Sequence, residues 1–469
     1  MAAPQHNGRT GTGGHLGAFV RESGYLRKWL ILGVSIGIIA GLGAVVFFLA
    51  LKYAGEFLLG GLGGYQQPQA IGDGGGSGSL GFSRPWAIPL TAFGGALVSA
   101  VIVAKFAPEA QGHGTDNAIE AALTDPRSIR SRAVVVKLIA SALTIGSGGS
   151  GGREGPTAQI SAGFGSLMTR RLNLSDDDGR LAVSLGIGSG IGAIFSAPLG
   201  GAVLAASIIY REDFNYRALV PGFITSATAY AVYGSILGFA PMFGFVEPNY
   251  RFDPAQTPWF VVIGIIAAGI GYLYARTFYG TIALTKRLPG GIVIKPAIGG
   301  LLVGLLALAI PQILSSGYGW VQIAMTREGL ATIPLWIVLV LPMAKILATS
   351  LSIGTGGSGG IFGPGIVIGG FVGAAIWRLA DTLGAPGIPD GPGLFVIVAM
   401  MACFGSVAHA PLAVMIMVAE MTGSFSVIPA AMITVGVAYL IISRTPVSIY
   451  RAQRLNRDSD VGDQGSIQR

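Results

Sequence analysis

The sequence contains few charged side chains. Only 11% of its 469 residues are Asp, Glu, Lys or Arg, whereas 51% are hydrophobic. Soluble domains carry about 25% charged residues, because a surface exposed to water needs them. The composition therefore excludes an ordinary soluble protein and predicts an integral membrane protein.

Cysteine and histidine are also scarce. The single cysteine, Cys403, excludes an internal disulfide, and the four histidines have no metal-ligand spacing. The apolar segments contain few carboxylates, which disfavours a cation transporter, and they contain no convergent set of nucleophile, base or metal ligands for a membrane-embedded enzyme. We therefore expect no metal, no cofactor and no enzymatic activity.

Long apolar runs are present instead. Residues 29–51 form a stretch of 23 residues without charge, and residues 86–104, 258–275 and 332–343 are similar. A helix needs roughly 20 apolar residues to cross the hydrocarbon core of a membrane. The first run is too long for a signal peptide and is expected to be retained. The sequence thus predicts a multi-pass helical protein surrounded by membrane lipid.

The net charge of +8 comes from basic residues that flank the apolar runs. Because they form no single patch, they predict no nucleic-acid partner. The positive-inside rule places both termini in the cytoplasm, and we expect a prokaryotic inner (plasma) membrane. We divide the chain into an N-terminal cytoplasmic tail (1–24), a transmembrane domain (25–454) with a flexible linker at 66–81, and a C-terminal cytoplasmic tail (455–469), without CBS domains.

An internal repeat organises the apolar region. The segment "IGSGGSGGREGPTAQI", which begins at Ile145, recurs as "IGTGGSGGIFGPGIVI" from Ile353, 208 positions later. The motif "GHG" at 112–114 matches "GYG" at 317–319, and the "APL" motif that contains Pro198 matches the one that contains Pro411. Three motifs in the same order indicate two related halves, at about 80–240 and 285–445.

Repeated apolar segments that are interrupted by glycine and proline are typical of transporters with broken helices. The N-termini of these helices meet near the middle of the membrane, where free backbone N–H groups and the helix dipoles attract an anion. The predicted substrate is therefore a small anion.

Glu154 lies at the predicted start of such a helix. When ionised it can occupy the place of the substrate anion, and when protonated or displaced it leaves the path open. The alternative is a structural role, as the partner of Arg153 or as a helix cap. The second repeat has Ile361 and Phe362 at this position and supplies only backbone donors.

Four segments resemble the signature sequences of the CLC family of chloride channels and proton-coupled anion exchangers: "GREGPTAQI" (152–160), "GIFGP" (360–364), "FSAPLGG" (195–201) and "HAPLAVMIMVAEMT" (409–422). The resemblance implies an all-α polytopic membrane protein built as an inverted repeat of two antiparallel halves with tilted and broken helices. It also implies a homodimer with one anion pathway per subunit.

The same resemblance implies particular site residues. Glu154 would be the external gating glutamate. The expected anion-binding residues are Gly112, His113, Gly114, Gly152, Arg153, Gly155, Gly360, Ile361, Phe362 and Tyr450. For Tyr450 the alternative is an aromatic residue at the membrane interface.

The first anion-binding segment departs from the family pattern, because His113 replaces a serine. Its imidazole N–H could bind the anion in place of the hydroxyl, or its ring could point away and leave only backbone donors; both interpretations stay open. Asp116 is expected to cap the following helix. Lys137 either adds positive potential or extends to the membrane interface, and we favour the second interpretation.

A second departure concerns protons. Exchangers of the family commonly carry a glutamate on the cytoplasmic side, and Ile208 stands at its position. Isoleucine cannot carry a proton, which favours passive, channel-like chloride transport gated by Glu154. The alternative is a proton-coupled chloride or anion antiporter, and fluoride or nitrate remain alternative substrates.

Overall fold

The computed structural model describes residues 23–79, 81–244 and 250–457, so most of both predicted tails lies outside the described residues. Over these ranges the chain is helical and contains no strand. The first half comprises α2 (Tyr25–Gly55), α3 (Ala87–Phe106), α4 (Thr115–Thr124), α5 (Ser131–Gly146), α6 (Glu154–Leu172), α7 (Asp176–Ile194), α8 (Pro198–Ser207) and α9 (Tyr216–Leu237). The second half comprises α10 (Thr257–Arg287), α11 (Ile294–Ala307), α12 (Tyr318–Ala324), α13 (Arg327–Thr332), α14 (Leu335–Ser352), α15 (Phe362–Thr382), α16 (Gly393–Val407), α17 (Pro411–Thr422) and α18 (Ile428–Ile442).

Six helical segments of the described chain are long and apolar enough to cross a membrane. They are Tyr25–Leu62, Ala87–Phe106, Pro254–Arg287, Leu335–Ser352, Phe362–Thr382 and Phe425–Ile442. The first four overlap the four runs predicted from the sequence. The shorter apolar helices, such as α8 and α17, are buried by their neighbours, which is how partial helices are tolerated at membrane depth. The chain is therefore a multi-pass helical membrane protein.

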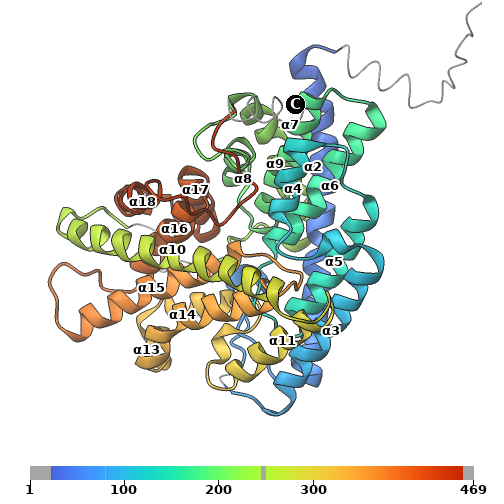
Figure 1. Ribbon diagram of the computed structural model, residues 1–469. Helices are drawn as coiled ribbons and strands as arrows, with labels where there is room; N and C mark the ends of the chain where they lie inside the picture. Colours follow the sequence, from blue (N-terminus) through green and yellow to red (C-terminus); the bar gives the residue numbers. More distant parts are fainter. Residues whose placement is uncertain (1–22, 80, 245–249, 458–469) are drawn as a thin grey trace, which may run out of the picture.

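The repeat is visible in the order of the helices and in the backbone. Helices α5 to α9 correspond in order to α14 to α18 (Figure 1). The chain breaks match as well, because Gly148 and Gly356 have φ angles of 109° and 113°, and Ser196 and His409 have φ angles of 54° and 50°. Both halves thus turn the chain in the same way before their broken helices begin.

The two halves meet at the N-termini of α6 and α15. Just before these helices, Gly152 and Gly360 form an isolated antiparallel bridge. The N–H of Gly152 donates to the carbonyl of Gly360 (2.8 Å), and the N–H of Gly360 donates back to the carbonyl of Gly152 (2.7 Å). Such reciprocal bonds relate the two segments by a local two-fold axis. The predicted inverted repeat of antiparallel halves with broken helices is confirmed.

Close packing of the long helices depends on glycine. A Cβ atom at Gly37 of α2 would lie 2.5 Å from the carbonyl oxygen of Thr225, and one at Gly41 would lie 2.6 Å from that of Ala229. Both carbonyls belong to α9, so the two helix backbones touch along a stripe of small residues. Membrane helices associate closely in this way when small side chains face one another. The packing ties α2, the first long helix, to α9, the last helix of the first half.

Candidate anion-binding site

The carboxylate of Glu154 fills the space between the two halves. Glu154 is the first residue of α6, and 0% of its surface is exposed. A Cβ atom at Gly152 or Gly360 would lie 2.2 Å from one of its carboxylate oxygens, so both glycines are needed to make room for it. The hydroxyl of Tyr318, the first residue of α12, donates to Oε2 over 3.3 Å. The carboxylate is thus enclosed by segments from both halves.

The start of α15 also faces this carboxylate. The backbone N–H groups of Phe362 and Gly363, and that of Glu154 itself, interact with it. These groups belong to the free N–H set at the ends of two helices, where the dipoles favour negative charge. The carbonyl of Ile361 accepts a hydrogen bond from the hydroxyl of Tyr274 (2.8 Å), which fixes the peptide just before α15. Glu154 therefore occupies a position at which an anion would be stabilised.

Arg153 does not pair with Glu154. Its Nη1 lies 2.8 Å from Oδ1 of Asp73, and both side chains are largely buried. The guanidinium also lies over the rings of Phe48, Phe195 and Tyr318, at 5.4 to 5.9 Å from their centres. The ion pair therefore holds the guanidinium of Arg153 at the start of α6, next to Glu154 in the chain.

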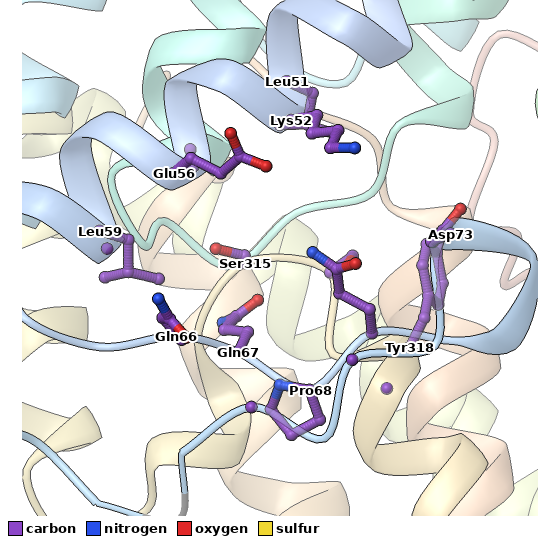
Figure 2. A pocket seen from close by; sticks show the side chains of 18 of the residues that line it. Leu51, Lys52, Glu56, Leu59, Gln66, Gln67, Pro68, Asp73, Ser315 and Tyr318 are labelled. Atoms are coloured by element: carbon purple, nitrogen blue, oxygen red, sulfur yellow. The ribbon is translucent and has the colours of Figure 1, made fainter. Parts of the chain in front are cut away.

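A cavity of about 700 Å³ reaches this cation and Tyr318 from the surface (Figure 2). It is lined by Lys52 and Glu56 at the end of the first long helix and by residues of the segment that follows. Its lining also includes the polar side chains of Gln66 and Gln67, and Tyr318, whose hydroxyl donates to Glu154. The cavity thus reaches two neighbours of Glu154, namely Arg153 and Tyr318.

The segment predicted as a flexible linker forms a wall of this cavity. The backbone oxygen of Pro68 lies against Gly319, where a Cβ atom would come within 2.0 Å of it. The N–H of Gly72 donates to the carbonyl of Met242 over 3.0 Å. The segment connects the first two spans as predicted, but these contacts hold it against distant parts of the chain, which its low-complexity composition did not reveal.

A third chain segment joins the junction from the other side. Gly112 and Gly114 have φ angles of 75° and 86°, which turn the backbone into α4. The N–H of Gly112 donates to the carbonyl of Gly357 (3.1 Å), and a Cβ atom at Gly155 would lie 2.2 Å from the carbonyl oxygen of His113. The glycine motifs predicted from the sequence are thus brought together at one place.

Asp116 is not a helix cap. Helix α4 has no side-chain cap, and Asp116 accepts hydrogen bonds from the hydroxyl of Tyr279 (3.0 Å) and the backbone N–H of Ala452 (3.2 Å). Its Oδ2 lies 3.1 Å from Nε2 of His113. The prediction failed because partners hundreds of residues away along the chain compete successfully for this carboxylate.

Tyr450 lies near the junction and is buried. Its ring centre is 6.1 Å from that of His113 and 6.2 Å from that of Phe404, which places it away from the interface position considered as the alternative. Phe404 in turn contacts Phe362 at 4.2 Å. A continuous series of ring contacts runs through Tyr318, Phe195, Phe362, Phe404, Tyr450 and His113. The series joins the neighbourhood of Glu154 to the segment that carries His113. The sequence did not predict Tyr318, Phe195 or Phe404 as parts of the site.

Lys137 does not reach the membrane interface. It is fully buried, and its Nζ donates to the carbonyls of Ala110 (3.1 Å) and Gly112 (2.6 Å). Lys345, which the sequence reading missed, is also fully buried and donates to the carbonyls of Ile313 (2.9 Å) and Ser315 (2.8 Å). The favoured interpretation of Lys137 was wrong, because carbonyl groups of an interrupted segment offer it hydrogen bonds that lipid cannot.

Ile208 lies at the end of α8 with 0% of its surface exposed. Its carbonyl accepts a hydrogen bond from Nε2 of Gln453 (3.1 Å), and its side chain packs in the main apolar cluster. Glu212, the next carboxylate along the chain, is exposed. The position at which exchangers of the family commonly carry a glutamate is thus apolar here.

Two inverted halves whose broken helices meet around a buried carboxylate define a multi-pass membrane transport protein rather than a receptor or a structural membrane protein. The family model described as "Voltage gated chloride channel" matches residues 95–443. The chain belongs to this CLC family, whose members transport anions.

The sequence is similar to proteins of Methanocaldococcus, Vibrio and Salmonella. The chain is 27% identical over 405 residues to an uncharacterized protein of Methanocaldococcus jannaschii, which covers 86% of this chain and 91% of the relative. It is 31% identical over 351 residues to the H(+)/Cl(-) exchange transporter ClcA of Vibrio campbellii and 31% identical over 353 residues to ClcA of Salmonella agona. Each of these two alignments covers 72% of both chains.

Solved structures share the fold. A slow cyanobacterial Cl-/H+ antiporter matches with a TM-score of 0.74 and 21% identity, over 94% of this chain and 99% of that protein. A CLC-type fluoride/proton antiporter matches with a TM-score of 0.76 and 21% identity, over 93% and 100%. At 21% identity the similarity shows the fold and not the transported ion.

Proposed function

We propose that the chain transports chloride along a path that runs from the external cavity, past Glu154, to His113 and Tyr450. The observation that carries this proposal is the carboxylate of Glu154, which fills a buried place between the N-termini of α6 and α15. A place that stabilises one negative group stabilises another of similar size. Backbone groups of Gly152, Gly155, Gly360, Ile361 and Phe362 surround this place, and Arg153 and the segment Gly112–Gly114 flank it.

Glu154 acts in this proposal as the gate. A single long hydrogen bond from a side chain, that of Tyr318, holds the carboxylate, so a competing anion or a proton can release it. In its place the free anion gains the same backbone donors. The proposed transport involves no metal, no cofactor and no covalent intermediate. We therefore propose that the protein is not an enzyme.

Transport is passive in the version that we favour. The buried side chain of Ile208 supplies no proton acceptor where exchangers of the family commonly carry a glutamate. The alternative is proton-coupled antiport, and the ClcA relatives named as H(+)/Cl(-) exchange transporters support it. The structural similarity to a fluoride/proton antiporter keeps fluoride as an alternative substrate, and nitrate is a third because His113 replaces the serine of the family.

We further propose a homodimer with one path per subunit in a prokaryotic inner membrane, with both termini in the cytoplasm. Exposed apolar side chains on the long helices, such as Leu42, Val98 and Ile265, support contact with lipid. Basic residues near the start of α2 and the ends of α6 and α10 support the assigned orientation.

Reconstitution into liposomes tests the function. Chloride efflux down a gradient and external pH are followed together. Chloride efflux without uphill proton movement supports passive transport, and efflux that drives protons uphill supports the antiporter. Absence of chloride efflux, with fluoride or nitrate efflux instead, would overturn the proposed substrate while leaving the path intact.

A further inference from the structure

His113 has one ring nitrogen that is bound and one that is not. Only 6% of the residue surface is exposed. Nε2 lies 3.1 Å from Oδ2 of Asp116. Nδ1 is buried and has no hydrogen-bond partner among the residues that the structure describes. A buried ring nitrogen without a hydrogen-bond partner costs free energy. Because His113 lies beside the proposed anion path, we infer that a ligand supplies the missing partner.

Asp116 determines which nitrogen carries hydrogen in the neutral ring. Its carboxylate already accepts from the hydroxyl of Tyr279 and from the N–H of Ala452, and a carboxylate in this role is an acceptor. Nε2 of His113 therefore donates to Asp116, and this network fixes the tautomer. Neutral His113 then presents a lone pair at Nδ1, which repels an anion. Only the doubly protonated ring offers an N–H donor there.

The surroundings of the ring place His113 beside the proposed path. The ring of His113 lies 6.1 Å from that of Tyr450 and 6.0 Å from that of Phe278. Tyr450 contacts Phe404, which contacts Phe362 at the start of α15. An anion that leaves the helix N-termini toward the cytoplasm thus passes the edge of this imidazole.

The charged and titratable groups around His113 come from several elements. Asp116 on α4 lies against the ring, and Lys137 on α5 donates from Nζ to the carbonyl of Gly112, the residue before His113. Tyr279 on α10 and Tyr450 in the C-terminal segment present hydroxyl groups. Arg451 lies 3.8 Å above the ring of Tyr279, and Arg211 acts electrostatically on Asp116. A proton on Nδ1 of His113 would add positive charge near these cations. We therefore expect the proton to enter together with an anion.

We propose that His113 and Asp116 form a proton-linked anion site, in which a small halide binds beside Nδ1 together with one proton on that nitrogen. The proposal rests on the anion path proposed above and adds a titratable ligand to it. Halide and proton enter together, so the net charge of the buried site does not change and the cost of burying the anion falls. Histidine suits this role because its charge changes between about pH 5 and 8.

The test separates His113 from the gate, since Glu154 is itself titratable. Chloride binding is measured by calorimetry on the purified Glu154→Gln protein, in two buffers of different ionisation enthalpy. We expect uptake of about one proton per chloride on the alkaline side of the histidine titration, and an affinity that falls by up to about tenfold per pH unit there. His113→Asn in the same background is expected to bind chloride without proton uptake and with an affinity independent of pH.

Two further variants control the measurement. His409 is the matched control, because it is also buried and its Nε2 lies 2.9 Å from the carbonyl of Val447, away from Asp116. His409→Asn should keep the proton uptake. His113→Gln replaces His113→Asn if the latter does not fold, as judged by thermal unfolding.

Chloride binding without proton uptake in Glu154→Gln, or uptake that survives in the His113 variant, would overturn the proposal. Absence of chloride binding and efflux in the unmodified protein would instead overturn the anion path itself.

Discussion

Lys137 and Lys345 are related by the same 208 positions that separate the two repeats, and they make the same contacts. Each is fully buried, and each donates to two backbone carbonyls in the segment that precedes a broken helix. Lys137 thereby holds the segment that carries His113, and Lys345 holds the segment that leads to Tyr318. One lysine in each half thus fixes a segment that leads to a broken helix.

Replacing either lysine by methionine removes the donor from two buried carbonyls. We expect Lys137→Met and Lys345→Met each to lower the free energy of unfolding by about 2 kcal/mol, measured as a lower midpoint of thermal unfolding in detergent. Lys137→Met should also weaken chloride binding, whereas Lys345→Met should change the pH dependence of gating through Tyr318. Lys105→Met, at an exposed position of α3, serves as the control. Equal midpoints for all three variants would contradict a structural role of the pair.

Tyr318→Phe removes the hydroxyl that donates to Glu154. Because a net hydrogen bond contributes about 0.5–1.5 kcal/mol, the open state should gain a factor of roughly 2 to 12 in population. Chloride efflux from liposomes should rise at neutral pH by up to this factor and change little in acid, where the gate is already released. Tyr439→Phe, which lies against His409 rather than the gate, should behave like the unmodified protein. Unchanged efflux would show that the hydroxyl does not restrain Glu154.

Gly152 and Gly155 lie near each other but constrain different atoms. A Cβ atom at Gly152 meets only the flexible end of Glu154, so Gly152→Ala should displace the gate and make chloride efflux less dependent on pH. A Cβ atom at Gly155 meets the backbone of His113 at 2.2 Å and that of Gly360 at 2.8 Å, which cannot move as easily. Gly155→Ala should therefore reduce the yield of folded protein in size-exclusion chromatography. The reverse pattern would contradict the placement of the carboxylate.

Asp73→Asn leaves the guanidinium of Arg153 without its negative partner at the inner end of the external cavity. A more positive cavity attracts anions, so chloride efflux at low external salt should rise, and this gain should shrink as ionic strength increases. Asp381→Asn, which removes the half-buried partner of Arg327, is the control and should have no effect. Slower efflux in Asp73→Asn would instead indicate that the ion pair keeps the path open.

The sequence predicted the features that repeat along it. The two Gly-rich segments, the broken helices and Glu154 at a helix start follow from spacing and composition alone, and the structure confirms the architecture. It could not predict that Asp73 pairs with Arg153 or that Tyr318 reaches Glu154, because those contacts join segments that no local pattern relates. Lys345 could have been predicted from the sequence, because the offset of 208 between the repeats relates it to Lys137.

The central claim is that Glu154 is a removable plug between two helix N-termini. Its most direct test is chloride efflux from liposomes as a function of pH, for the unmodified protein and for Glu154→Gln. We predict that the neutral amide does not compete with the anion. Chloride efflux in Glu154→Gln should therefore be at least as fast as in the unmodified protein at neutral pH, and it should not change with pH. Loss of chloride efflux in a folded Glu154→Gln protein would contradict the account, because it would make the carboxylate a required part of the path.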